Sequence, residues 1–269
     1  MGCSKSRAVA GVDIGAATAK AVILSGNQFF PFSIIPTGFS VASSAESVIE
    51  DALQKSGLSS SELEYVVSTR SGRRLVSFSN KVATEIICHA AGASSVVPEA
   101  RTIIDIGGQD SKVIGLDNNG NVSNFVMNDK CAAGTGRFLE VMARVLEIEI
   151  GEMGTLSLLG EEPCQIGSTC TVFAESEMVS LRAEGKRGEN ILAGIHKAMA
   201  HRIAIMGKSV GFRKEVVFTG GVARNVGMKK ALEDEIGLEI LVPQEPQIVG
   251  ALGAALLAKA ELAKLGKDR

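Results

Sequence analysis

The sequence predicts an α/β protein that is built from two similar halves, with helices covering its sheets. Helical and strand patterns alternate along the 269 residues, as they do in proteins whose sheets carry helices on their faces. The motif Asp-Ile-Gly, followed by four residues and then Lys, occurs at Asp13 and again at Asp105. Each copy lies between an apolar strand pattern and a β-branched one. Two copies in matching contexts indicate a duplicated half-domain and a ligand held between the halves.

The first half is expected to begin with a strand, a tight turn and a second strand over residues 10–24. Further elements are separated by capping and turn residues. We expect a strand over 29–36, a helix capped by Ser44 and ending at Lys55, a strand over 65–68, and a helix capped by Asn80 and ending near Ala91. Pro98 marks a hinge, so residues 1–98 form the predicted N-terminal half.

The second half repeats the opening strand–turn–strand over 102–114 and adds a third hairpin strand over 122–127. Helices are predicted over 136–146, from Thr171 and from Gly188, with a short amphipathic stretch that reaches Leu159. A buried strand over 216–219 ends at two glycines and precedes another helix. The predicted C-terminal half is 99–247, and a last helix within 248–269 is expected to pack back toward the N-terminal half.

The composition argues against two classes of partner. The 28 lysines and arginines nearly balance the 30 acidic residues and Trp is absent, so neither charge nor stacking surfaces favour nucleic acid. The longest apolar tract, 248–257, has the length of a core helix and is too short to cross a membrane. Gly2, Cys3 and Ser6 match a short lipidation pattern, which we interpret as a chance match in a polar terminus. The five cysteines follow no secretory segment, so we expect them to be reduced, metal-bound or catalytic, and we expect a cytoplasmic location.

The two Asp-Ile-Gly turns contain the residue types that bind a nucleotide. Each places a carboxylate at a strand end, beside glycines that allow backbone N–H groups to approach a phosphate. Two facing turns would clamp a nucleotide tail, and Asp13 and Asp105 would hold Mg²⁺ through water molecules. A third segment, 217–225, delivers two glycines to the start of a helix and suits the approach of an adenosine. The sequence contains no P-loop motif.

Two cysteines lie in matched settings. Cys131 and Cys170 each come just before a predicted helix start, where the positive end of the helix dipole favours a thiolate. An iron–sulfur cluster requires four thiolates, so a twofold dimer that shares one cluster would complete the set. A single-chain site that adds Cys88 and Cys164 is the alternative. Cys88 is interpreted as a buried apolar residue, and Cys164, in a polar loop, stays open as a ligand.

The cysteine segments resemble a known family. Residues 128–139, with Cys131, and 168–177, with Cys170, resemble the activator ATPases of 2-hydroxyacyl-CoA dehydratases. The same group includes ATPase subunits of benzoyl-CoA reductase and the reductase of double-cubane cluster proteins. Residues 105–112 and 219–223 also match, and the similarity covers about 9–258.

The resemblance implies two ribonuclease-H-like domains of the actin, sugar kinase and heat-shock chaperone ATPase fold, with ATP in the cleft. It also implies a dimer, with itself or with a paralogous subunit, in which Cys131 and Cys170 of both chains hold one 4Fe–4S cluster. Such proteins hydrolyse ATP to push a single electron, received from ferredoxin or flavodoxin, onto a partner enzyme at very negative potential. The acceptor would be an acyl-CoA dehydratase, an aromatic-ring reductase or a double-cubane protein.

Within this mechanism Asp13 and Asp105 organise Mg²⁺ and water, residues 107–110 receive the γ-phosphate, and either Gln109 or Asp110 orients the attacking water. The residues predicted to bind the nucleotide are Gly15, Ala16, Ala17, Thr18, Lys20, Gly107, Gly108, Gln109, Gly220, Gly221, Val222 and Asn225. Two segments depart from the family pattern. Residues 15–18 lack hydroxyls directly after the glycine, and residues 69–73 read Thr-Arg-Ser-Gly-Arg where Thr-Gly-Tyr-Gly-Arg is more usual.

Two other functions fit part of the pattern. A small-molecule kinase of the same fold would use the nucleotide cleft, and an ATP-binding regulator without a cluster would act by association alone. Both leave Cys131 and Cys170 without a role.

Overall fold

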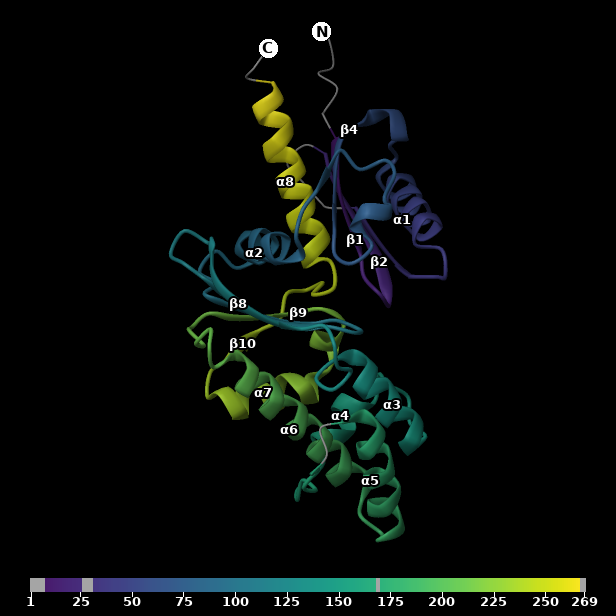
Figure 1. Ribbon diagram of the computed structural model, residues 1–269, viewed down its shortest axis with the longest axis vertical. Helices are drawn as coiled ribbons and strands as arrows, with labels where there is room; N and C mark the ends of the chain where they lie inside the picture. Colours follow the sequence, from purple (N-terminus) through teal and green to yellow (C-terminus); the bar gives the residue numbers. More distant parts are fainter. Residues whose placement is uncertain (1–7, 26–30, 168–169, 267–269) are drawn as a thin grey trace. The chain divides into compact units, whose positions relative to one another are not determined.

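The computed structural model describes residues 8–25, 31–167 and 170–266, and Cys3 with its lipidation pattern lies outside them. The chain forms two compact units. The first unit combines Met1–Pro98 with Gln247–Arg269, and the second is Glu99–Pro246 (Figure 1).

The first unit contains a five-stranded mixed sheet. Its strands lie in the order β3-β2-β1-β4-β5. They are β1 (Ala8–Ile14), β2 (Thr18–Leu24), β3 (Phe32–Pro36), β4 (Leu63–Thr69) and β5 (Lys81–Val82). The first three form an antiparallel meander, whereas β4 runs parallel to β1 and to β5. The register pairs Asp13 with Lys20 on one side and with Thr69 on the other.

Helices cover both faces of this first sheet. They are α1 (Val41–Ser56), α2 (Glu85–Val96) and α8 (Val249–Leu265), and α1 and α8 lie on opposite sides of β1 (Figure 1). Alternate residues of β1 separate two cores: Ala10 and Val12 pack with α1, and Val9 packs with α8. Asp13 has the same parity as Val9, so its side chain lies on the face that α2 and α8 cover.

The second unit repeats this sheet topology. Its strands lie in the order β10-β9-β6-β7-β8. They are β6 (Thr102–Ile106), β7 (Ser111–Leu116), β8 (Val122–Asn128), β9 (Val216–Thr219) and β10 (Ile240–Leu241). Again three strands form an antiparallel meander and the fourth, β9, runs parallel to the first. Asp105 pairs with Lys112 on one side and with Thr219 on the other.

The helices of the second unit gather on one face of its sheet (Figure 1). They are α3 (Gly136–Leu146), α4 (Met153–Ser157), α5 (Thr171–Ala183), α6 (Gly188–Gly207) and α7 (Val226–Ile236). Their core includes Ile104, Ile106 and Phe218 from the strands, all fully buried. Burying a side chain of this size contributes about 1.5–3 kcal/mol, so this face anchors the turn after Ile106.

The predicted starts at Gly136, Thr171 and Gly188 agree with the structure, but two predicted caps are wrong. The first helix begins at Val41 because the hydroxyl of Ser40, rather than Ser44, accepts the N–H of Ser43. Asn80 caps no helix. Its side-chain oxygen accepts the N–H of Val66 at 2.7 Å. The residues after Asn80 form β5, and α2 begins only at Glu85.

The apolar tract that begins at Ile248 forms most of α8. Among the described residues, no helix is both long and apolar enough to cross a membrane.

Candidate functional site

The first Asp-Ile-Gly turn joins β1 to β2. The N–H of Gly15 donates to the carbonyl of Thr18 at 3.1 Å, which closes the turn, and Ala16 and Ala17 at its tip are exposed. The Thr37 hydroxyl donates to the carbonyl of Gly15 at 2.8 Å. The tip of the turn is therefore exposed, while the hydrogen bonds at its base hold it in place.

Asp13 lies buried beneath this turn among cationic side chains. Its Oδ1 is 3.6 Å from Nζ of Lys20 and 3.7 Å from Nε of Arg70. Nη2 of Arg70 is 3.4 Å from Nε2 of His89, which is also buried. On the remaining side α8 approaches so closely that a Cβ on Gly250 would collide with Oδ2 of Asp13. Asp13 thus supplies a fixed negative charge under the turn rather than an exposed ligand.

The second turn has a tighter arrangement around one lysine. Nζ of Lys112, fully buried, is 3.2 Å from Oδ2 of Asp105 and 2.9 Å from Oδ2 of Asp110. The Thr219 hydroxyl donates to Oδ1 of Asp105 at 3.0 Å. Asp105 is fully buried, whereas the side chain of Asp110 is 21% exposed and Gln109 beside it is exposed. Among the four predicted catalytic residues, Gln109 and Asp110 are therefore the ones that solvent reaches most.

The backbone of the second turn is bonded directly to the start of α3. The N–H of Gly107 donates to the carbonyl of Asp110 at 2.9 Å. The N–H groups of Gly136 and Arg137 donate to the carbonyls of Gly107 and Gly108, each at 2.8 Å. These two N–H groups belong to the first helical turn, whose donors have no partners within the helix. A displacement of residues 107–108 would therefore be transmitted to the first turn of α3.

The third predicted segment joins the second turn. Gly220 follows β9 with a φ of +89°, and a Cβ there would lie 2.9 Å from Oδ1 of Asp105. Only glycine fits this approach without strain. Farther on, Asn225 caps α7 by accepting the N–H of Met228 at 2.8 Å, and its amide nitrogen is 3.1 Å from Nε2 of His196. Gly220 thus lies beside Asp105, while Asn225 organises the helix start behind it.

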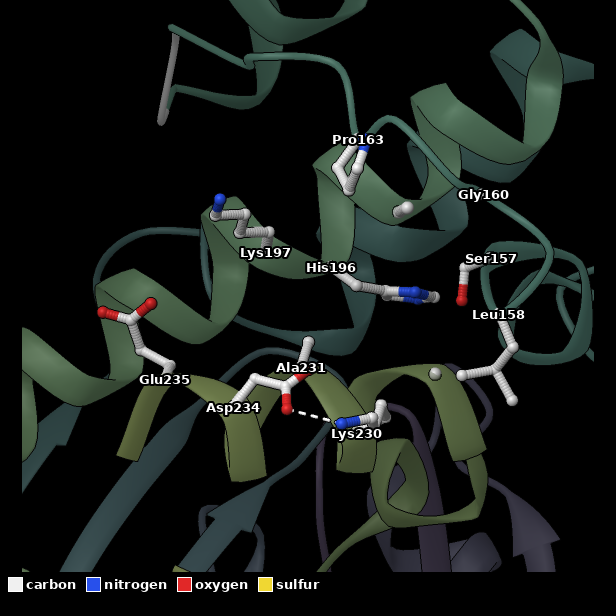
Figure 2. A pocket seen from close by; sticks show the side chains of 12 residues that line it. Ser157, Leu158, Gly160, Pro163, His196, Lys197, Lys230, Ala231, Asp234 and Glu235 are labelled. Carbon is white, nitrogen blue, oxygen red and sulfur yellow. Dashed lines mark hydrogen bonds and ion pairs between the residues drawn. The ribbon is translucent and has the colours of Figure 1, made fainter. Parts of the chain in front are cut away.

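A pocket of about 460 Å³ opens between α4, α6 and α7. Figure 2 shows the His196 ring directed toward Ser157, and the charged side chains of Lys197, Lys230 and Glu235 also line the pocket. Burial lowers the pKa of His196 to about 4, so the ring is neutral at pH 7. Because Asn225 donates to Nε2, the proton of the neutral ring lies on Nδ1, and no described residue accepts it. Nδ1 is itself buried, so it belongs to the floor rather than to the open part of the pocket.

The cysteines differ sharply in accessibility. Cys170 is the N-cap residue of α5 and is exposed, and Cys131 is partly exposed in the loop before α3. The amide of Asn128 holds that loop by donating to the carbonyls of Cys131 and Ala133 at 2.8 and 3.0 Å. Burial raises the pKa of Cys88 to about 12, so its thiol keeps its proton. In the described ranges, no three Cys, His, Asp or Glu side chains gather as a metal site.

The structure thus brings most predicted residues into two groups. Asp13 and Lys20 meet under the first turn, and Asp105, Asp110 and Lys112 meet under the second. Sequence reasoning did not select Arg70 and His89, which complete the first group. The unusual loop 69–73 was the available signal for Arg70, and a histidine within an apolar helix gave none for His89.

Comparisons with known proteins identify the family of the chain. Residues 10–258 match the model of the BadF/BadG/BcrA/BcrD ATPase family. The 2-hydroxyisocaproyl-CoA dehydratase activator of Clostridioides difficile is 46% identical over 259 residues, which cover 96% of this chain and 97% of that protein. The solved structure of an activator of the 2-hydroxyisocaproyl-CoA dehydratase from Clostridium difficile, with bound ADPNP, has a TM-score of 0.93 at 45% identity and covers 97% of this chain and 98% of its own.

A more distant solved structure shows how widely the fold is shared. A ROK family glucokinase from Streptomyces griseus, in complex with glucose and AMPPNP, has a TM-score of 0.57 at 14% identity, covering 94% of this chain and 99% of its own. At that identity the likeness concerns the fold alone, and it confirms the predicted sugar-kinase type of α/β architecture. From the family match and the close relatives we conclude that the chain belongs to the BadF/BadG/BcrA/BcrD ATPase family.

Proposed function

We propose that this ATPase is an iron–sulfur electron-transfer protein, which couples ATP hydrolysis to the delivery of single low-potential electrons to a partner enzyme. The observation that carries the proposal is the placement of Cys131 and Cys170. Both precede helices of the second unit, α3 and α5, which pack against each other, and both thiols are at least partly accessible. The close relative named as a dehydratase activator supports an acyl-CoA dehydratase as the acceptor.

The charges around the two turns support separate roles in nucleotide binding. Two cations, Lys20 and Arg70, lie beside the carboxylate of Asp13, and their positive charge favours phosphate at the first turn. Two carboxylates, Asp105 and Asp110, lie beside the ammonium group of Lys112. Their negative charge favours a cation at the second turn. ATP or ADP would bind through the glycines and exposed backbone of the predicted residues.

The residues of the second turn fit Mg²⁺. This ion prefers oxygen ligands and keeps several waters, so one partly exposed carboxylate and the nucleotide phosphates satisfy it. Asp110 meets that requirement, while the buried Asp13 and Asp105 would act at longer range through lysine or water. When bound, the ion would neutralise phosphate charge during hydrolysis. Gln109 and Asp110 remain the two candidates for orienting the attacking water.

The cysteines fit a 4Fe–4S cluster shared by two chains. Cys131 and Cys170 supply two thiols, and in the described part of one chain no further Cys or His joins them as a metal site. Cys88 is disfavoured as a ligand because its thiol keeps its proton. When bound, the cluster would accept and release one electron.

The surface beside Cys170 supports the dimer. Val172, Phe173 and Val179 of α5 are between half and three-quarters exposed, which is an apolar face that a second chain would cover. That second chain is a copy of this one or a paralogous subunit. Ferredoxin or flavodoxin would supply the electron, and an aromatic-ring reductase or a double-cubane protein stays open as an alternative acceptor.

The bonds between the second turn and α3 offer a route from nucleotide to cluster. Residues 107–108 accept the first N–H groups of α3, and Cys131 lies just before that helix. A change of nucleotide at the turn would shift α3 and with it one ligand of the cluster. This route is short and needs no intermediate domain.

Anaerobic purification tests the proposal. The wild-type protein is expected to be brown, to bleach on reduction, and to contain about four iron atoms per dimer. Cys131→Ser and Cys170→Ser should each lose the iron and keep ATP binding, while Cys164→Ser serves as the matched control and should keep both. A colourless, iron-free wild type that still binds ATP would instead support a kinase or a cluster-free regulator. Full iron content in Cys131→Ser would contradict the ligand assignment.

A further inference from the structure

Arg70 occupies the position that a glycine occupies in the other unit. In the first unit Asp13 pairs with Thr69 of β4, and Arg70 follows. In the second unit Asp105 pairs with Thr219 of β9, and Gly220 follows. The two sheets have the same strand order, so Arg70 and Gly220 are structurally equivalent.

The backbone of Arg70 keeps the conformation of a glycine. Its φ is +70°, close to the +89° of Gly220. In the described residues, one other non-glycine has a positive φ, Glu147, which ends α3 as a helix cap. Non-glycine residues in this region are strained, and they persist where the surrounding structure holds them, often at functional sites. Position 70 thus carries a long side chain although its left-handed backbone conformation favours glycine.

The guanidinium of Arg70 spans the first turn. Its Nε lies 3.7 Å from Oδ1 of Asp13, and its Nη2 lies 3.4 Å from Nε2 of His89. The remaining nitrogen, Nη1, lies 3.5 Å from where a Cβ of Gly15 would be, so it faces the glycine of the turn. The side chain is only 5% exposed and is therefore held in place rather than moving in solvent.

The loop that carries Arg70 is also fixed to the turn. The N–H of Gly72 donates to the carbonyl of Ile14 at 3.0 Å, one residue before Gly15. Nη1 of Arg73 donates to the carbonyl of Arg70 at 2.7 Å. Both bonds hold the strained residue in register with the turn, which positions its guanidinium before any ligand arrives.

We propose that Arg70, which stands where the family more usually has glycine, is a phosphate-contacting catalytic residue of this chain, whose guanidinium reaches the phosphates bound at the first turn and stabilises their charge during hydrolysis. The inference rests on the proposed nucleotide site at that turn. In the reaction the bond from the γ-phosphorus to the β,γ-bridging oxygen breaks and its electron pair stays on ADP, while the oxygen of water bonds to that phosphorus and the proton of the water is released with the inorganic phosphate. Arg70 stays protonated throughout and forms no covalent bond. A planar guanidinium with several donors suits phosphoryl oxygens better than the single ammonium of Lys20.

The second unit shows that the fold does not need this arginine. In that unit the Asp105–Lys112 ion pair forms under an equivalent turn, and Gly220 stands in place of Arg70. Arg70→Gly should therefore fold, and it removes the backbone strain. If the role of Arg70 were purely structural, the substitution would lower stability and would have no specific effect on the chemical step.

The test compares Arg70→Gly, Arg70→Asn and Arg70→Lys in the full chain, with Arg74→Gly as the control because Arg74 is exposed on the same loop. Asparagine tolerates a positive φ and lacks the guanidinium. We expect kcat for ATP hydrolysis to fall about 100- to 1000-fold in the Gly and Asn variants, with KM changed less than tenfold. Their melting temperatures should fall by no more than a few degrees, because Lys20 still lies beside Asp13 and the backbone strain at position 70 is relieved. Arg70→Lys should recover a minor part of kcat, and the control should match the wild type.

A second readout separates chemistry from binding. ADP with aluminium fluoride, which mimics the transferring phosphoryl group, should form a stable complex with the wild type and with Arg74→Gly, whereas the Gly and Asn variants should bind ADP but not the complex. Wild-type kcat and trapping in Arg70→Gly would overturn the role of Arg70 while leaving the proposed function intact. A loss of thermal stability in the Gly and Asn variants with no fall in kcat would also overturn it. A wild type without ATP hydrolysis would instead contradict the proposed nucleotide site.

Discussion

The two Asp-Ile-Gly turns share a motif and a topology but differ in charge and in packing. Under the first turn Asp13 lies 3.6 and 3.7 Å from two cations, whereas under the second turn Lys112 lies 3.2 and 2.9 Å from two carboxylates. The Thr219 hydroxyl donates to Asp105 in the second group, whereas the hydroxyl of Thr69 in the first group makes a hydrogen bond with the thiol of Cys88. The two related turns thus differ in composition: two cations lie beside a carboxylate at the first, and two carboxylates lie beside a lysine at the second.

This difference indicates a division of labour. The first group retains a strained arginine, as expected where binding is favoured over stability. The second turn anchors the start of α3 and so connects with the cysteine helices. Substitutions at matched positions of the two units test this interpretation.

The largest contrast is expected between the two lysines. Lys112→Met leaves two carboxylates without their buried cation and should lower the free energy of unfolding by about 3–5 kcal/mol. Lys20→Met should cost less than half as much, because Arg70 still lies beside Asp13. Urea titrations followed by circular dichroism measure both values. Equal losses would show that the two turns are packed alike.

Acid should weaken the second unit through His196. The unfolded histidine takes up a proton below a pKa of about 6.5, whereas the buried ring resists protonation until about pH 4. The unfolded state therefore binds more protons in this window, and stability should fall by about 3 kcal/mol as the pH drops from 6.5 to 4. Hydrogen exchange at both pH values should show protection lost first in α6 and α7.

A matched pair of variants isolates this effect. His196→Gln should remove most of the acid dependence, and His201→Gln should leave it, because His201 is exposed and paired with Glu235 on the surface. An unchanged acid dependence in His196→Gln would assign the effect to other groups.

The smallest contrast concerns the two threonines after the motif strands. Thr219→Val removes a hydrogen bond to a buried carboxylate and should cost about 2 kcal/mol. Thr69→Val removes only a weak hydrogen bond with the thiol of Cys88, so stability should change by less than about 0.5 kcal/mol. Thermal unfolding of the two variants gives the comparison. A larger loss in Thr69→Val would mean that the first group is as closely bonded as the second.

Elements with local signals could be predicted from the chain alone. The hairpins around both turns follow from strand periodicity and glycine, and the helix starts at Gly136, Thr171 and Gly188 were placed correctly. The predicted caps at Ser44 and Asn80 are wrong because the backbone path before a helix, which depends on the tertiary structure, decides which side chain reaches the free N–H groups. Asn80 bonds instead to Val66, on a strand that pairs with the one it precedes.

The motif pairs Asp13–Lys20 and Asp105–Lys112 lie within one hairpin each, so spacing and strand register were sufficient to bring them together. Arg70 and His89 reach the first turn from β4 and α2, and their contacts depend on the parallel pairing of β4 and the packing of α8 against α2. Local interactions are encoded in neighbouring residues, whereas contacts between distant segments arise only when burial of apolar faces assembles the sheet. That assembly brought the second cation, Arg70, to the first turn, whereas the second carboxylate of the other turn, Asp110, is encoded within the motif itself.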